Sequence, residues 1–377
     1  MISADRVGPL ELLVIQPTPF CNLDCSYCYL PDRGNKRKMT LETLEKALSW
    51  VFSSGLVRQP LTLLWHAGEP MVLPAAFYEQ ATLVLERCNT GPFEVTQSLQ
   101  TNATLVNEAW CDFIRRRNVQ IGVSVDGPDF LNDRHRVTRK GGGTLASVLR
   151  GMNMLRDHEI SFDVITVLTA TSLDYPDELF DFYVEHGITS VAFNVEEIEG
   201  PHVASSLSDD GIEPRFRRFY SRFMDLALAS DPPLRVREYD TACNAITYQQ
   251  ESKARAQECR PFGILNVDYE GNFSTYSPEL LGLSGPRHGS FALGNVERDT
   301  LESVLTMPRF ITLDDEIRRG VELCEETCRY FPFCGGGPPG NKFFENGDFA
   351  TTETLSCRLH KKATFDVALD KLEQTGL

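Results

Sequence analysis

Short apolar segments alternate with amphipathic segments over the first two hundred residues of this 377-residue chain. Between the apolar segments, hydrophobic residues recur at helical spacing, as at Leu41, Leu44, Leu48 and Val51. Strands that alternate with helices predict a parallel sheet. The pattern therefore predicts six β/α units, a count that suits a barrel or a doubly wound sheet. The expected strands are rich in apolar and β-branched residues and cover residues 12–15, 61–65, 93–99, 121–125, 162–168 and 191–195.

Several residues mark where the predicted helices begin and end. Gly55 is expected to stop the first helix, and Gly187 follows a helical segment over 179–183. Thr144 is expected to cap the N-terminus of a helix over 145–155. A further helix over 213–229 carries a largely aromatic stripe that we expect to pack in the core, formed by Phe216, Phe219, Tyr220, Phe223 and Leu226.

The strand and helix alternation stops near Cys243, where cysteine, glycine and proline become frequent. This change predicts a second, smaller domain that is held together by metal. We therefore divide the chain into three segments. Residues 1–212 form the β/α region, residues 213–242 form a bridging helical segment, and residues 243–377 form the cysteine-rich domain.

The net charge of −16 argues against binding to nucleic acid or to an anionic membrane, because both require a basic surface. No run of eighteen apolar residues occurs, so no transmembrane helix is expected. The first six residues lack the basic and apolar regions of a signal peptide. Eleven cysteines in a chain without an export signal are expected to be metal ligands in a reducing cytoplasm.

Three of these cysteines, Cys21, Cys25 and Cys28, lie in one short loop with C-x3-C-x2-C spacing. Three thiolates can hold three corners of an iron–sulfur cube and leave the fourth iron open. The alternative is a structural zinc loop, which needs four ligands. No fourth Cys or His lies within thirty residues of Cys28, so the spacing favours the cluster.

The loop, with Tyr27 before its last cysteine, resembles the signature of radical S-adenosylmethionine (SAM) enzymes. The resemblance implies a partial (β/α)6 barrel for residues 1–212, with the chemistry at the C-terminal ends of the strands. It also implies that the open iron of a [4Fe–4S] cluster binds SAM. In that family, one electron from an external donor of the flavodoxin or ferredoxin type cleaves SAM, and the resulting radical abstracts a hydrogen atom from the substrate.

Residues at the ends of the second and third strands are similar to SAM-binding motifs of that family. Gly68 and Glu69 belong to a G-G-E-P-like turn in which Ala67 replaces the first glycine. Thr101 and Asn102 match the family's ending of the third strand. Without the cysteine loop, the Gly-Glu-Pro sequence would indicate only a turn.

The fourth strand and the segment after it supply further candidate SAM contacts. Ser124 and Asp126 alternate along the strand, so we expect both to point to the same side and to suit the ribose hydroxyls. Arg136 resembles a family arginine that pairs with the SAM carboxylate, although a surface ion pair is the alternative. Glu196 and Glu197, after the sixth strand, could meet substrate or face solvent.

The late cysteines resemble the SPASM extension, which holds two auxiliary [4Fe–4S] clusters in its full form. Tyr276 and Pro338 stand where the family has two cysteines of the inner cluster, and the gap between Cys324 and Cys328 is one residue longer. The resemblance therefore implies one auxiliary cluster, with four-cysteine zinc as the alternative. Cys243 and Cys259 are left over, and Cys88 and Cys111 are expected to be buried in helices. The expected ligands of the auxiliary cluster are Cys324, Cys328, Cys334 and Cys357.

Two further blocks, residues 274–280 and 330–348, resemble the cyclophane-forming peptide maturases of the GrrM/OscB type. The resemblance implies a ribosomal precursor peptide as partner and a bond between an aromatic ring carbon and a Cβ atom. The auxiliary cluster would accept the electron that the adduct loses. Glu279 is the candidate base that accepts the proton of the adduct. Only twenty residues precede Cys21, so we expect no leader-binding module there.

Three rival functions come from the same motifs. A sulfatase-type maturase that forms formylglycine is disfavoured by the missing inner-cluster cysteines. A thioether-forming maturase is disfavoured by the two subfamily blocks. An iron–sulfur scaffold without activity is disfavoured by the intact loop with Cys21, Cys25 and Cys28.

Overall fold

The structure is a computed structural model that describes residues 6–248 and 256–375. The prediction that the chain lacks an export signal rests largely on residues 1–5, which lie outside the described residues. Among the helices in the described ranges, none is both long and apolar enough to cross a membrane.

One ten-stranded sheet forms the centre of the molecule, with the order β12-β9-β8-β1-β2-β3-β4-β5-β6-β7. Strands β1 to β7 are parallel and lie in sequence order, which confirms the predicted β/α alternation. The predicted strand ends differ from the observed ones by at most two residues. The parallel strands are β1 (Leu12–Ile15), β2 (Leu61–Trp65), β3 (Val95–Thr101), β4 (Gln120–Ser124), β5 (Phe162–Leu168), β6 (Ser190–Val195) and β7 (Arg235–Val236).

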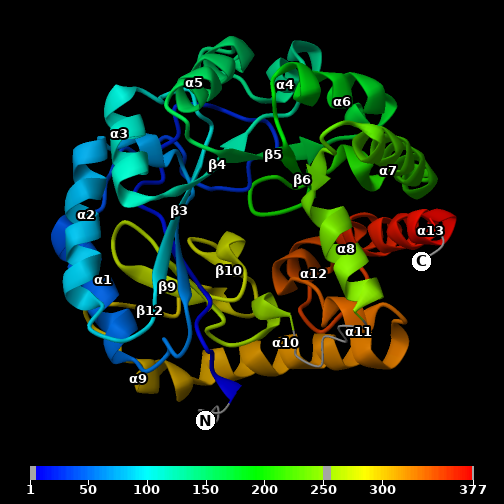
Figure 1. Cartoon of the computed structure of the whole chain (residues 1–377). Coiled ribbons are helices and arrows are strands. Elements are labelled where there is room, and N and C mark those ends of the chain that lie inside the picture. Colours follow the sequence, from blue (N-terminus) through cyan, green and yellow to red (C-terminus); the bar gives the residue numbers. More distant parts are fainter. Residues whose placement is uncertain (1–5, 249–255, 376–377) are drawn as a thin grey trace.

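Helices lie around the outside of this curved sheet (Figure 1). Buried apolar residues of the helices and strands form one continuous core. The first helix ends at Ser53, and Gly55 follows it with a φ of +72°, as expected of a helix stop. The covering helices are α1 (Leu41–Ser53), α2 (Ala75–Cys88), α3 (Glu108–Arg117), α4 (Asp129–His135), α5 (Leu145–Asp157) and α6 (Pro176–Glu185).

The cap of α5 differs from the prediction. Thr144 occupies the N-cap position, but its hydroxyl donates to the carbonyl of Arg136 at 2.7 Å and does not cap the helix. Asp133 caps it instead, because its Oδ1 accepts from the backbone N–H groups of Thr144 and Leu145, both at 2.8 Å. The N-cap position predicted for Thr144 is therefore confirmed, but Asp133 supplies the side-chain cap.

The bridging helix is α7 (Ile212–Ala229), and it packs as predicted. Phe216, Phe219, Tyr220 and Phe223 are buried, and the rings of Phe216 and Tyr220 stack with centroids 5.8 Å apart. The next helix, α8 (Arg237–Thr247), runs through the boundary expected at residue 242. The change of architecture therefore comes after α8.

The cysteine-rich segment continues the same sheet. Strand β8 (Ile264–Val267) pairs in parallel with β1, and β9 (Asn272–Thr275) and β12 (Gly294–Asn295) add antiparallel strands at that edge. A small hairpin is formed by β10 (Ser284–Gly285) and β11 (Gly289–Ser290). The helices of the cysteine-rich segment are α9 (Leu301–Leu305), α10 (Pro308–Thr327), α11 (Phe331–Cys334), α12 (Pro339–Asn346), a π-helix (Cys357–Ala363) and α13 (Thr364–Thr375). In this segment α13 packs against α8 (Figure 1).

Candidate functional site

The loop after β1 places Cys21, Cys25 and Cys28 in the wall of a cavity of about 340 Å³ at the C-terminal ends of the strands. Two long-range contacts fix this loop. Leu23 forms a β-bridge with Thr138, and the carbonyl of Cys21 accepts a hydrogen bond at 2.6 Å from the guanidinium of Arg139. The loop therefore cannot move independently of the segment after β4.

The three thiols are suited to a polynuclear cluster. Burial raises the pKa of the Cys21 thiol to about 12 and that of Cys25 to about 11, so both need a bound cation to become thiolates. Across the described ranges, no group of three or more Cys, His, Asp or Glu side chains is compact enough to hold a single metal ion. Three thiols in the wall of one cavity could supply three ligands of an iron–sulfur cluster.

The turn after β2 requires unusual backbone conformations. Gly68 has a φ of +63°, and a Cβ atom there would lie 2.4 Å from the carbonyl oxygen of Thr18. Ala67 has a φ of +66°, which is a left-handed conformation that favours glycine. This explains why the similar motif has glycine at the position of Ala67. Gly68 brings the turn against the start of the cysteine loop.

Glu69 connects the ends of β2 and β3. Its buried carboxylate accepts hydrogen bonds from Met71 N at 3.0 Å, Thr101 Oγ1 at 2.7 Å and Asn102 N at 2.8 Å. Asn102 in turn donates to the side-chain oxygen of Asn22 in the cysteine loop at 2.9 Å. Glu69 lines the cavity, but its hydrogen bonds make it a residue that holds the strand ends in place.

Ser124 and Asp126 have different surroundings, although Ser124 ends β4 and Asp126 lies only two residues later. Ser124 lines the cavity and accepts from Gln100 at 2.8 Å. Asp126 is buried and accepts from the Tyr27 hydroxyl and from Val167 N, and it pairs with Arg136 at 3.0 Å. Its carboxylate therefore holds Tyr27 and Arg136, and its contact with the ribose hydroxyls of SAM stays a prediction.

Arg136 is buried and lines the cavity, so it is not the surface ion pair considered as the alternative. Its guanidinium lies 5.5 Å from the centre of the Tyr27 ring. Its Nε is buried, and none of the described residues accepts a hydrogen bond from it. A buried donor without an acceptor is unfavourable in the free protein. The site therefore fits a ligand with a carboxylate group.

The four late cysteines line a second cavity of about 410 Å³. Cys324 lies in the last turn of α10, Cys328 follows that helix, Cys334 ends α11, and Cys357 begins the π-helix. Burial raises the pKa of the Cys357 thiol to about 12 and also raises that of Cys334. The structure thus brings together the four residues that the sequence grouped.

The position of the missing inner-cluster cysteines is filled by other side chains. Tyr276 is buried, and its hydroxyl donates to Asp314 at 3.0 Å, which pairs with Arg6 at 2.7 Å. Cys259 is buried, and its thiol donates to the carbonyl of Gly337 at 2.9 Å. Tyr276 is therefore a core residue whose hydroxyl is already hydrogen-bonded.

The remaining cysteines have separate surroundings. Cys243 is half-buried in α8, where its neighbours are Tyr239 and Asp240. Cys111 is buried as predicted. Cys88 is only half-buried, because it lies at the end of α2 beside Ser49.

The two cysteine-lined cavities share part of their walls, so they adjoin between the two sets of thiols. Glu196 lines the first cavity, and Glu197 lines both, which answers the question whether these residues face solvent. Burial raises the pKa of Glu279 to about 7. We call this shared region the chamber, and its walls common to both cavities are Leu64, His66, Asn194, Val195, Glu197, Glu199 and Glu279.

Two chamber residues were not identified from the sequence. His66 contacts the Tyr29 hydroxyl at 3.3 Å, and burial lowers its pKa to about 4. Glu199 is buried and accepts from Asn341 at 3.1 Å, and burial raises its pKa well above the usual range. Both follow predicted strands, β2 and β6, so the rule that placed the chemistry at strand ends could have found them.

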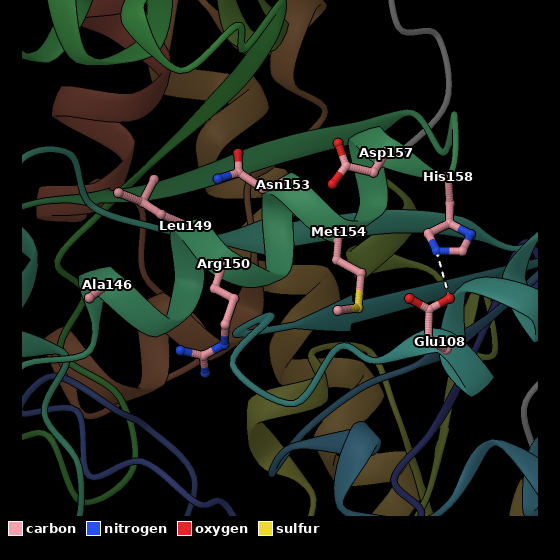
Figure 2. Close-up of a pocket in the computed structure, with 8 residues that line it drawn as sticks. All are labelled: Glu108, Ala146, Leu149, Arg150, Asn153, Met154, Asp157 and His158. Carbon is pink, nitrogen blue, oxygen red and sulfur yellow. Dashed lines mark ion pairs between the residues drawn. The ribbon is translucent and has the colours of Figure 1, made fainter.

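A separate hollow of about 440 Å³ lies on the outer helices and shares no lining residue with the chamber. Figure 2 shows residues of α5, such as Met154, together with the ion pair between His158 and Glu108, whose atoms lie 2.8 Å apart. Within the described part of the chain, this hollow is lined by one ion pair and by no cysteine, so it is not a second cluster site.

A family model described as the radical SAM superfamily matches residues 15–183. An uncharacterized protein of Synechocystis sp. is 43% identical over 378 residues, which cover 99% of this chain and 95% of that protein. The serine-type anaerobic sulfatase-maturating enzyme of Bacteroides thetaiotaomicron is 26% identical over 90% of this chain and 85% of its own length.

Solved structures share the fold across nearly the whole chain. The structure of native anSMEcpe with bound AdoMet and Cp18Cys peptide has a TM-score of 0.79 at 20% identity, and covers 97% of this chain and 99% of its own. Streptococcus suis SuiB bound to precursor peptide SuiA has a TM-score of 0.63 at 15% identity, and covers 92% of this chain and 76% of its own. This likeness bears out the fold that the sequence predicted.

Proposed function

We propose that this chain, whose residues 15–183 match the model of the radical SAM superfamily, modifies a peptide by joining an aromatic ring carbon to the Cβ atom of a nearby residue. SAM and [4Fe–4S] clusters, an auxiliary one included, are cofactors typical of this superfamily, as the sequence predicted. Residues at the ends of β1 to β4 are suited to binding SAM in the first cavity, and the four late cysteines are suited to holding the auxiliary cluster in the second. The observation that carries the proposal is the chamber, which both sets of cysteines reach.

The residues of the first cavity have distinct parts in this proposal. Cys21, Cys25 and Cys28 would hold the cluster, and the free Nε of Arg136 would meet the carboxylate of SAM. Asp126 holds Arg136 by an ion pair, and Glu69 holds the strand ends. When bound, the cluster and SAM supply the oxidising radical that removes a hydrogen atom from a substrate carbon.

The chamber would receive the precursor peptide. Structures of the same fold contain a Cp18Cys peptide and the precursor peptide SuiA, which supports a peptide as substrate. Crosslinking removes one hydrogen atom from Cβ and then one electron and one proton from the ring carbon that is attacked. Glu279, whose pKa burial raises to about 7, would accept the proton. The four late cysteines would hold the auxiliary cluster that takes the electron.

A second candidate function is oxidation of a serine or cysteine side chain to formylglycine. It is favoured by the match to anaerobic sulfatase-maturating enzymes along most of the chain. It is disfavoured by Tyr276 and Pro338, which stand at two positions that are cysteine in the complete SPASM pattern. An external one-electron donor of the flavodoxin or ferredoxin type and a cytoplasmic location remain parts of the proposal.

The direct experiment is anaerobic co-expression with a candidate precursor encoded beside this gene, followed by tandem mass spectrometry. A crosslink is expected to remove two hydrogen atoms and to suppress backbone fragmentation between the joined residues. Formylglycine made from serine also removes two hydrogen atoms, but it reacts with a hydrazide, whereas a crosslink does not. The variant Cys25→Ala is the matched control and should leave the peptide unmodified. A wild-type protein that forms no 5′-deoxyadenosine from SAM and dithionite would contradict the proposal.

A further inference from the structure

A lysine is buried directly beside one of the four late cysteines. Lys342, in α12, is only 4% exposed. Its ammonium donates to the carbonyl of Gly320 at 2.8 Å and contacts the sulfur of Cys324 at 3.3 Å. Both partners belong to α10, so the lysine connects α12 to the helix that presents Cys324 to the second cavity.

Lys342 differs from the other buried lysine of the fold, because no described carboxylate lies within ion-pair distance of it. Lys371 in α13 is 7% exposed and pairs with Asp225 at 2.6 Å. A buried ammonium without an anion is strongly unfavourable. A neutral carbonyl and a neutral thiol compensate it poorly. A thiolate bound to an iron–sulfur cluster carries the negative charge that would complete this arrangement.

Two further lysines bring positive charge to the same cavity. Burial raises the pKa of the Cys334 and Cys357 thiols, and the charges of Lys361 and Lys362 oppose that rise. Lys362 is also paired with Glu353, so part of its charge is neutralised. Lys361 lines the cavity itself. Lys342 remains the lysine with the shortest contact to a sulfur and the deepest burial.

We propose that Lys342 donates a hydrogen bond to the Cys324 sulfur of the auxiliary cluster and makes that cluster easier to reduce. Reduction adds one negative charge to the cluster, and both a hydrogen bond to a ligand sulfur and a nearby cation stabilise that charge. The inference rests on the proposed function, in which the four late cysteines hold a cluster that accepts one electron. Lys342 lines the second cavity beside Cys324 and is thus a positioning and tuning residue, which acts through the sulfur of Cys324.

The test uses the full chain with Cys21→Ala, Cys25→Ala and Cys28→Ala, so that only the auxiliary cluster remains. Redox titration followed by electron paramagnetic resonance gives its reduction potential. Adding Lys342→Met should lower the potential by at least about 59 mV, which is a tenfold change in the one-electron equilibrium. Lys342→Arg should restore most of the potential. The matched control Lys371→Met, which removes a buried lysine elsewhere, should leave the potential unchanged.

A second readout covers the case in which Lys342→Met fails to bind iron. The parent protein, exchanged into D₂O, should show an exchangeable deuteron coupled to the reduced cluster by pulsed double resonance. Its absence, or a potential that does not move in Lys342→Met, overturns the role of Lys342. A parent protein that binds no iron would contradict the proposed function itself, because the four late cysteines would then hold no auxiliary cluster. The role of Lys342 would be lost with it.

Discussion

At the scale of single residues, the first cavity depends on contacts between side chains that are far apart in the sequence. Tyr27 donates to Asp126 across 99 residues, and Asp126 holds Arg136. The residue types at Ser124 and Asp126 could be predicted from the strand alternation, but their roles could not. Only the folded structure shows that Asp126 is already engaged by three donors and that Arg136 keeps one free donor.

Replacing Gly68 by alanine tests the close approach of the turn to the cysteine loop. The added Cβ would lie 2.4 Å from the Thr18 oxygen, in a backbone conformation that side chains disfavour. We expect Gly68→Ala to lower the free energy of unfolding by about 1–3 kcal/mol, as measured by urea titration. Gly34→Ala is the control, because a Cβ at Gly34 meets no atom within 4 Å. Equal stability of the two variants would contradict this reading.

Glu279 should give the crosslinking reaction a characteristic pH dependence. A carboxylate accepts a proton only when it is deprotonated, and the pKa of Glu279 is raised to about 7. The single-turnover rate of crosslinking should therefore rise as the pH increases through about 7. Glu279→Gln should slow the reaction by roughly 10²–10⁴-fold and abolish that step in the profile. The exposed Glu297→Gln is the control. An unchanged rate and profile in Glu279→Gln would remove its role as the base.

At the scale of elements, the sequence predicted the first six strands because buried parallel strands are nearly continuous apolar segments. It did not predict β8, β9 and β12. These strands are short, and Asn266, Asn272 and Ser274 interrupt their apolar character. Strand β8 joins the sheet by pairing with β1, β9 pairs with β8, and β12 pairs with β9, which no local pattern records. The capping hydrogen bonds of Asp133 to α5 were missed for a similar reason, because Asp133 lies on the preceding helix.

The capping role of Asp133 can be measured directly. Asp133→Ala removes the acceptor for two N–H groups at the start of α5, so we expect a loss of about 1 kcal/mol in the free energy of unfolding. Asp157→Ala changes the same residue type at the other end of α5, where a negative charge is unfavourable, and should cost nothing. The measurement is urea unfolding, in which the midpoint should fall for Asp133→Ala and stay unchanged for Asp157→Ala. A larger loss from Asp157→Ala would contradict the assignment.

At the scale of the whole molecule, one sheet connects the two cysteine sets. Strand β1 leads into the loop with Cys21, and its neighbour β8 belongs to the segment that carries the late cysteines. The cavities that they line share the chamber wall, which includes His66 and Glu279. The grouping of cysteines could be predicted from their spacing. That both groups reach one chamber could not, because it depends on how the C-terminal segment packs against the strand ends.

The most direct test of this arrangement is the iron content of the wild-type protein after anaerobic reconstitution, with Mössbauer spectroscopy to identify the clusters. Two [4Fe–4S] clusters should give about eight irons per chain, and a variant that lacks Cys21, Cys25 and Cys28 should keep about four. About four irons in the wild-type protein would show that one of the two sites is empty. About twelve would show a third cluster and contradict the interpretation of Tyr276 and Pro338.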